Sequence, residues 1–190
     1  MTAADPKADF YFRHRAAIEE WAALRSTARA AFNDGLSSAL SVFDPDEVLG
    51  ASEVVEQRGS WHNVGLRRPE WPANGWPVAV VLGWNAGTVL DPARNELPFV
   101  GVYLEPGDDR KEMSKDAALA LATVARNQGW TGQREDAYPL WTQVPQPEGD
   151  PSMASWVQAS YEALHQAWTA LSPAISHFVS TSTPSTAQDG

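Results

Sequence analysis

Three carboxylates, Glu105, Asp108 and Asp109, lie within five residues of one another and are potential metal ligands. They follow an apolar run typical of a buried strand, and carboxylate oxygens are suitable ligands for Mg²⁺. A two-metal nuclease also needs a group that positions the attacking water, and the nearest lysines, Lys111 and Lys115, lie beyond the strand. Asp108 and Asp109 precede a predicted helix, whose dipole their charge would complement. We therefore predict no metal and no cofactor, and keep these carboxylates as the alternative, a metal-dependent nuclease-like hydrolase.

The other reactive side chains form no catalytic motif. The sequence contains no Gly-rich phosphate loop, nucleophile elbow, paired-His zinc motif or calcium loop, and it has no cysteine. The four histidines are far apart and lack ligand spacing: His14, His62, His165 and His177. His62, on a predicted strand, is a candidate base or ligand beside Glu105, but an ordinary sheet histidine is the simpler interpretation. We predict no catalytic residue.

The nine tryptophans carry more information about binding. Trp71 and Trp76 lie five residues apart in a loop rich in Pro and Gly, together with Glu70 and Asn74. Exposed aromatic residues of this kind often anchor a protein partner, so these four residues are the predicted partner-binding site. The alternative is that the two rings fold back as a lid over the core.

A third hypothesis is a small-ligand site on the sheet. It would use Trp61, Trp84 and Tyr103, which lie on predicted strands. This hypothesis requires a deep apolar cleft between the sheet and the helices.

The net charge of −10 limits the classes of partner. Phosphate-tracking surfaces need clustered Lys and Arg, but the chain has only three lysines, and outside the first helix its basic residues adjoin only in pairs such as Arg67-Arg68. Direct nucleic-acid binding is therefore disfavoured. An acidic surface can bind a basic protein or imitate nucleic acid, or it can simply maintain solubility.

The sequence has no feature of a membrane or secreted protein. No apolar run approaches the roughly 18 residues of a membrane span, and the N-terminus lacks the apolar region of a signal peptide. We expect a cytoplasmic protein without membrane association. The sequence does not indicate its oligomeric state.

Periodicity predicts an α+β fold with a small, mainly antiparallel sheet of about four strands, packed by an N-terminal helix and two C-terminal helices. The first helix is expected to end or be interrupted at Asn33-Asp34-Gly35, and the last to end near Leu171, before a kink or fresh start at Pro173. The predicted helices are 9–32, 111–127 and 152–171, and the predicted strands are 53–58, 61–66, 77–84 and 99–105, with 138–141 as a candidate edge strand. Residues 1–179 are expected to form one domain, and residues 180–190 a disordered tail rich in Ser, Thr and Pro.

Three short stretches carry a resemblance to a known family. They are Val-Gly-Val-Tyr-Leu at 100–104, Tyr-Pro-Leu-Trp at 138–141, and the closing helix with Trp156, Trp168 and Leu171-Ser-Pro173. Together they resemble the non-catalytic region of the PD-(D/E)XK restriction-like nuclease superfamily. No lysine follows a carboxylate by two positions on a predicted strand, so the nuclease signature is not found and no catalytic residue is carried over.

These observations favour a non-enzymatic function. The resemblance implies an accessory or regulatory protein of prokaryotic defence or counter-defence systems. We expect it to bind a protein partner through its acidic surface and its Trp-rich loop.

Overall fold

The computed structural model describes residues 5–39, 53–71, 78–89, 91, 94, 96–105, 110–132, 135–149 and 152–182. It confirms the predicted α+β class and the antiparallel sheet, but the sheet has five strands rather than about four. The elements in chain order are α1 (Pro6–Ala39), β1 (Glu53–Gln57), β2 (Trp61–Arg67), β3 (Val78–Asn85), β4 (Phe99–Leu104), α3 (Arg110–Asn127), β5 (Leu140–Gln143) and α4 (Met153–Ser182).

The five strands follow one another across the sheet in the order β1-β2-β3-β4-β5, and every neighbouring pair is antiparallel. The additional strand is β5, which comes from the short aromatic run predicted as an edge strand and pairs with β4. The central strand β3 is buried except at its last residue, Asn85. Its nearly continuous apolar sequence is therefore explained by cover on both faces.

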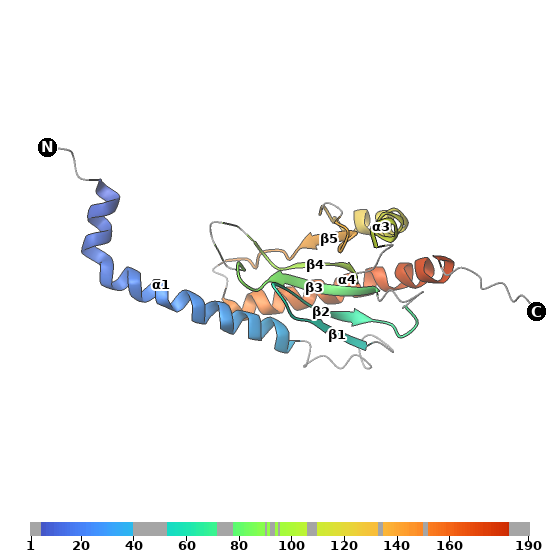
Figure 1. Ribbon diagram of the computed structural model, residues 1–190, viewed down its shortest axis with the longest axis horizontal. Helices are drawn as coiled ribbons and strands as arrows, with labels where there is room; N and C mark the ends of the chain where they lie inside the picture. Colours follow the sequence, from blue (N-terminus) through green and yellow to red (C-terminus); the bar gives the residue numbers. More distant parts are fainter. Residues whose placement is uncertain are drawn as a thin grey trace, which may run out of the picture.

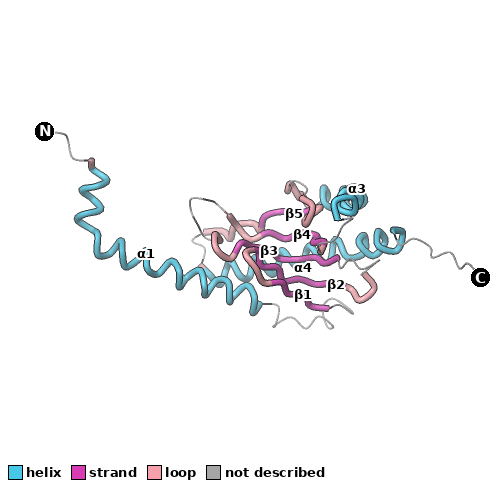
Figure 2. Tube along the Cα trace, in the orientation of Figure 1, coloured by secondary structure: helices cyan, strands magenta, loops and turns pink. Residues whose placement is uncertain are grey.

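One face of the sheet packs against the helices, with α4 lying behind the strands in the view of Figures 1 and 2. Side chains alternate along a strand, so every second residue of β3 points to this face. These are Val78, Val80, Leu82 and Trp84, and they join Leu121 of α3 and Trp168, Leu171 and Ile175 of α4 in the main core.

The last helix continues beyond its predicted end. It passes through Pro173 and ends at Ser182, because the buried stripe of Leu171, Ile175 and Phe178 runs on past the proline. The predicted tail at 180–190 therefore begins inside the helix, and residues 183–190 lie outside the described residues. None of the helices in the described ranges is long and apolar enough to span a membrane.

The first helix also runs through its predicted stop. Asn33 takes part in packing instead of ending the helix: its Oδ1 accepts a hydrogen bond of 2.8 Å from Nε1 of Trp84, and its Nδ2 donates one of 3.2 Å to the carbonyl of Ala86. Phe32 and Leu36 beside it are buried in the main core. The inner end of α1 is thus fixed to the sheet, whereas Figure 1 shows its outer part projecting from the body and bending.

Candidate functional site

The face of the sheet opposite to α4 carries the candidate site. Glycines in its central rows remove side chains and leave room for rings to lie on the backbone. A Cβ atom added at Gly83 would lie 2.3 Å from Cζ of Phe99, so this ring lies directly over the glycine. One added at Gly101 would lie 2.9 Å from Cβ of Trp141. The two central rows are Asn63–Gly83–Phe99–Gln143 and Gly65–Val81–Gly101–Trp141.

Phe99 is the centre of an aromatic cluster on this face. Its ring centroid lies 5.0 Å from that of Tyr138, 5.8 Å from that of Trp141 and 5.9 Å from that of Trp61, all in edge-to-face orientation. Tyr103 lies 5.5 Å from Tyr138. Such contacts hold the rings in fixed positions and add to the energy of burial. The cluster therefore forms a rigid apolar floor.

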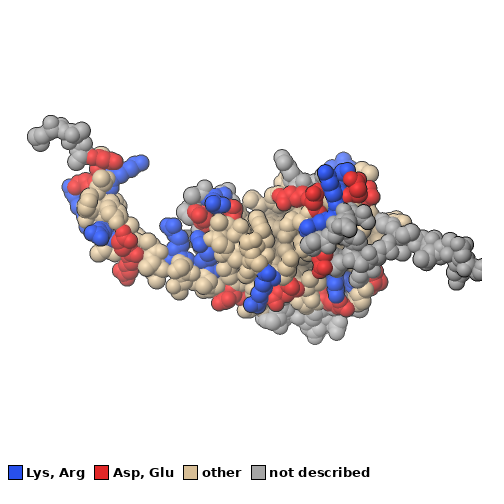
Figure 3. Space-filling view, viewed as in Figure 1, with Lys and Arg blue, Asp and Glu red and all other residues tan. Residues whose placement is uncertain are grey.

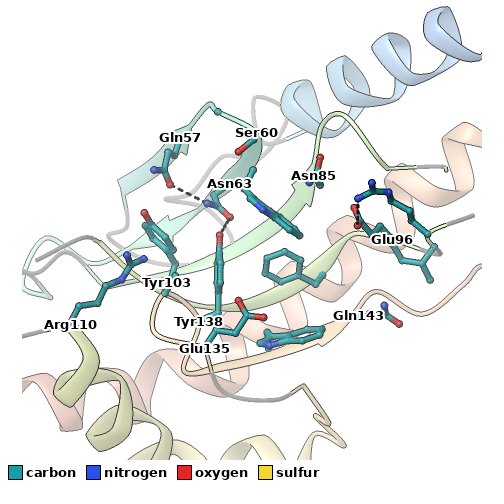
Figure 4. Close-up of a pocket in the computed structure, with 17 residues that line it drawn as sticks. Gln57, Ser60, Asn63, Asn85, Glu96, Tyr103, Arg110, Glu135, Tyr138 and Gln143 are labelled. Carbon is teal, nitrogen blue, oxygen red and sulfur yellow. Dashed lines mark hydrogen bonds and ion pairs between the residues drawn. The ribbon is translucent and has the colours of Figure 1, made fainter.

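Above this floor lies a cleft of about 590 Å³ (Figure 4). Its walls come from the turn between β1 and β2, from Arg94, Glu96 and Leu97 before β4, and from Glu135, Ala137 and Tyr138 before β5. Trp61 stands at the rim, with 45% of its surface exposed. The volume lies within the range of roughly 300–1,000 Å³ found for ligand pockets.

A chain of neutral hydrogen bonds crosses the cleft. The hydroxyl of Tyr138 donates to Oδ1 of Asn63 at 3.0 Å, and Nδ2 of Asn63 donates to Oε1 of Gln57 at 3.1 Å (Figure 4). Asn63 is almost fully buried, so both bonds satisfy groups that would otherwise be costly to bury. Gln57 is exposed. Because its Oε1 accepts the hydrogen bond from Asn63, the amide of Gln57 is oriented and its NH₂ group remains to bind a ligand.

Burial raises the pKa of Tyr138 to about 12, which predicts a loss of stability at high pH. Below pH 10 the phenol is neutral in the folded and unfolded states; between about pH 10 and 12 only the unfolded state releases the proton. We expect this difference to lower the free energy of unfolding by roughly 2 kcal/mol at about pH 11.5. Urea unfolding near pH 9 and pH 11.5 measures the loss.

The variant Tyr138→Phe supplies the control for this prediction. It lacks the titrating group, so its stability should fall less over the same pH interval, while Tyr161, whose pKa burial also raises to about 12, contributes equally to both proteins. An identical fall in the two proteins would contradict the assignment.

Charged groups are balanced around the cleft. Arg94 lies 3.9 Å from Glu96, and the guanidinium of Arg110 lies 5.8 Å from the ring centre of Tyr103. The buried Nε of Arg110 has no hydrogen-bond partner among the described residues. In the view of Figure 3 the middle of the body is uncharged, and acidic and basic side chains are mixed around it. This face therefore presents no one-signed surface to a partner.

The cleft is lined by aromatic, amide and charged side chains. The lining residues include neither histidine nor lysine. The described residues also contain no group of three or more His, Asp or Glu side chains able to hold a metal. The described site offers aromatic surface and neutral amides, with charged side chains of both signs around them.

The predicted partner-binding loop is described only in part. Trp71 is 0% exposed, and its Nε1 donates to Oγ of Ser176 at 2.8 Å, so this ring takes the lid arrangement over the core and is not part of an exposed lip. Glu70 is exposed beside Arg68. Asn74 and Trp76 lie outside the described residues, so their binding role stays a prediction.

His62 and Glu105, the candidate base and the one metal candidate within the described residues, are not brought together. His62 pairs with Trp84 near one end of β3, whereas Glu105 follows Leu104, which pairs with Val78 at the other end. At about 3.3 Å per residue this register separates them by roughly 20 Å, so the proposed neighbourhood of His62 and Glu105 is wrong. Asp108 and Asp109, the other two metal candidates, lie outside the described residues.

The small-ligand hypothesis identified two of the cleft residues and misplaced the third. Trp61 and Tyr103 line the cleft, but Trp84 lies on the opposite face of the sheet under α1. The cleft itself is on the face away from α4, not between the sheet and the helices. Sequence reasoning missed Asn63 and Phe99, although the glycines in the strands were an available signal.

Comparisons of the chain with family models, with curated proteins and with solved structures give no match. The resemblance to the non-catalytic region of restriction-like nucleases, and the role in prokaryotic defence that it implies, therefore stay predictions.

Proposed function

We propose that this protein is a non-enzymatic binding protein that receives a segment of a partner polypeptide in the aromatic cleft. The observation that carries the proposal is the cleft of about 590 Å³ floored by Phe99, Tyr138 and Trp141. Aromatic side chains in a well-packed pocket are the usual anchors of protein–protein interfaces.

The polar rim supports a polypeptide as the ligand. Gln57 and Gln143 stand on the first and last strands, at opposite sides of the cleft, and both are exposed. Each amide offers donors and an acceptor, which match the N–H and C=O groups of an extended peptide. The mixed charges around the cleft favour a segment that is itself mostly apolar.

Replacement of Trp61 by alanine should weaken this binding. Trp61 offers much of its ring to the cleft rim, so its removal should raise the dissociation constant of a bound peptide at least about tenfold. The measurement is titration of peptides selected by display from a random library, followed in NMR spectra through the indole N–H signal of Trp141, and also through that of Trp61 in proteins that retain it.

Leu119→Ala is the matched control. Leu119 is exposed on α3 and does not line the cleft, so this variant should bind the selected peptides as the unmodified protein does. If no peptide perturbs the two indole signals, or if both variants bind equally well, the proposal fails.

A small aromatic molecule is the second candidate ligand. The hydrogen-bond chain ending at Gln57 favours it, because one oriented amide above a rigid apolar floor is typical of small-molecule sites. A fragment library screened on the same NMR signals distinguishes the two ligands. Fragments that bind with clear saturation, together with failure of all peptides, would favour this candidate.

A further inference from the structure

The outer part of α1, residues 6–28, is called the arm here. All of its residues are exposed except the half-buried Ile18. Its large apolar side chains are strongly exposed, Phe10 at 59%, Trp21 at 71% and Leu24 at 56%. Monomeric soluble proteins rarely leave such surface uncovered, so the arm has the character of an interface.

The apolar residues of the arm follow a coiled-coil repeat. Spacings of four and three residues alternate along one stripe of the helix, which consists of Phe10, His14, Ala17, Trp21, Leu24 and Ala28. Alternating steps of this kind place every member on the seam between two paired helices. Arg13 and Glu20 flank the seam on one side, and Ile18 and Arg25 on the other.

We propose that the arm pairs antiparallel with the arm of a second copy of this chain. In one register every large residue of the stripe faces a small or flat one. Ala17 lies opposite the partner's Trp21, Phe10 opposite the partner's Ala28, and Leu24 opposite the partner's His14. Shifting one helix by one heptad loses this match. In one direction Phe10 would face the partner's Trp21, and in the other Trp21 would face the partner's Leu24.

The charges agree with the same register. In an antiparallel pair, the residues that flank one side of the seam lie next to the residues that flank the same side in the partner helix. Arg13 then comes within reach of Glu20 of the partner copy, and two-fold symmetry makes this contact twice. On the other side Ile18 meets the partner's Ile18 at the symmetry axis. A second copy therefore satisfies both the shape and the charge of the arm.

The bend in α1 does not oppose this pairing (Figure 1). Sharp bends are usually fixed by proline or glycine inside a helix. The arm has Pro6 only at its first position, where proline is well tolerated, and no glycine before Gly35. The sequence thus contains none of these causes, and the paired arm can be straight.

The small size of the interface indicates a weak dimer. At 1.5 Å per residue the arm is roughly 35 Å long, and a contact strip about 10 Å wide gives roughly 350 Å² per copy in projection. This lies below the usual area of stable interfaces, about 800 Å² per partner. The dimer should therefore be reversible, and should form between about 10 µM and 1 mM.

Sedimentation velocity of the full chain over this concentration range tests the proposal. Trp21→Glu should raise the dissociation constant at least about tenfold, because it places a charge in the seam. The matched control is Phe12→Glu, whose ring is 74% exposed on the opposite side of the helix and should leave the dimer unchanged. A chain that remains monomeric throughout, or a dimer indifferent to Trp21→Glu, overturns the proposal.

Single cysteines test the orientation, since the chain has none of its own. Ile18→Cys should form a disulfide-linked dimer under mild oxidation, whereas Leu24→Cys should not, because Leu24 faces His14 of the partner copy. Efficient cross-linking through Leu24→Cys with none through Ile18→Cys would indicate parallel helices and overturn the antiparallel pairing.

Discussion

Gly65→Ala is expected to destabilise the protein by at least about 3 kcal/mol. A Cβ atom at this position would lie 2.2 Å from the carbonyl oxygen of Val80 and 2.8 Å from Cα of Val81. Both are backbone atoms of the neighbouring strand in the middle of the sheet, so no side-chain rotation relieves the overlap. The strands β2 and β3 would have to separate, with loss of ladder hydrogen bonds. Urea unfolding followed by tryptophan fluorescence measures the change.

Two other glycine-to-alanine variants serve as controls for this prediction. Gly59→Ala meets nothing closer than 3.5 Å and should change stability by less than about 0.5 kcal/mol. Gly83→Ala meets side-chain atoms of Phe99 and Asn63 and no backbone atom among its nearest neighbours, so its cost should be intermediate and it should alter the cleft. Equal stability of Gly65→Ala and Gly59→Ala would show that the two strands are not packed as closely as described.

Apolar periodicity and composition predicted the elements of this fold well. The run from Pro77 to Trp84 became β3, and the run from Phe99 to Glu105 became β4, because short runs dense in Val and aromatic residues and bounded by Pro or Gly are typical of buried strands. Helix ends were predicted less well. Asn33 and Pro173 are local stop signals, yet both lie inside helices because their neighbours Phe32, Leu36, Leu171 and Ile175 are buried in the core.

The candidate site could not be assembled from the sequence for a different reason. The cleft depends on strand register, which decides which residues share a face and which end of a strand each one occupies. A tryptophan at position 84 and one at position 61 are equally aromatic in the sequence, but the pairing of Trp61 with Asn85 places them on opposite faces. Asn63 and Tyr138, which are joined by a hydrogen bond, are 75 residues apart in the chain.

Trp71→Ala is expected to cost about 3–5 kcal/mol of stability, the usual penalty for truncating a fully buried tryptophan. Its ring lies 5.2 Å from that of Trp168 in α4, and its indole N–H is bonded to Ser176. The substitution would leave a large cavity between the end of β2 and the last helix. Trp61→Ala, at a rim position that is 45% exposed, should cost less than about 1 kcal/mol under the same conditions.

Ser176→Ala separates packing from hydrogen bonding at Trp71. It leaves the ring in place but removes the acceptor of a buried N–H, which should cost about 1–3 kcal/mol. With Trp71→Phe the donor is absent, so adding Ser176→Ala should then cost much less, and the double-mutant cycle gives the coupling between the two side chains. A Trp71→Ala protein with unchanged stability but weakened partner binding would instead restore the exposed aromatic lip, since only an exposed ring can be removed without opening the core.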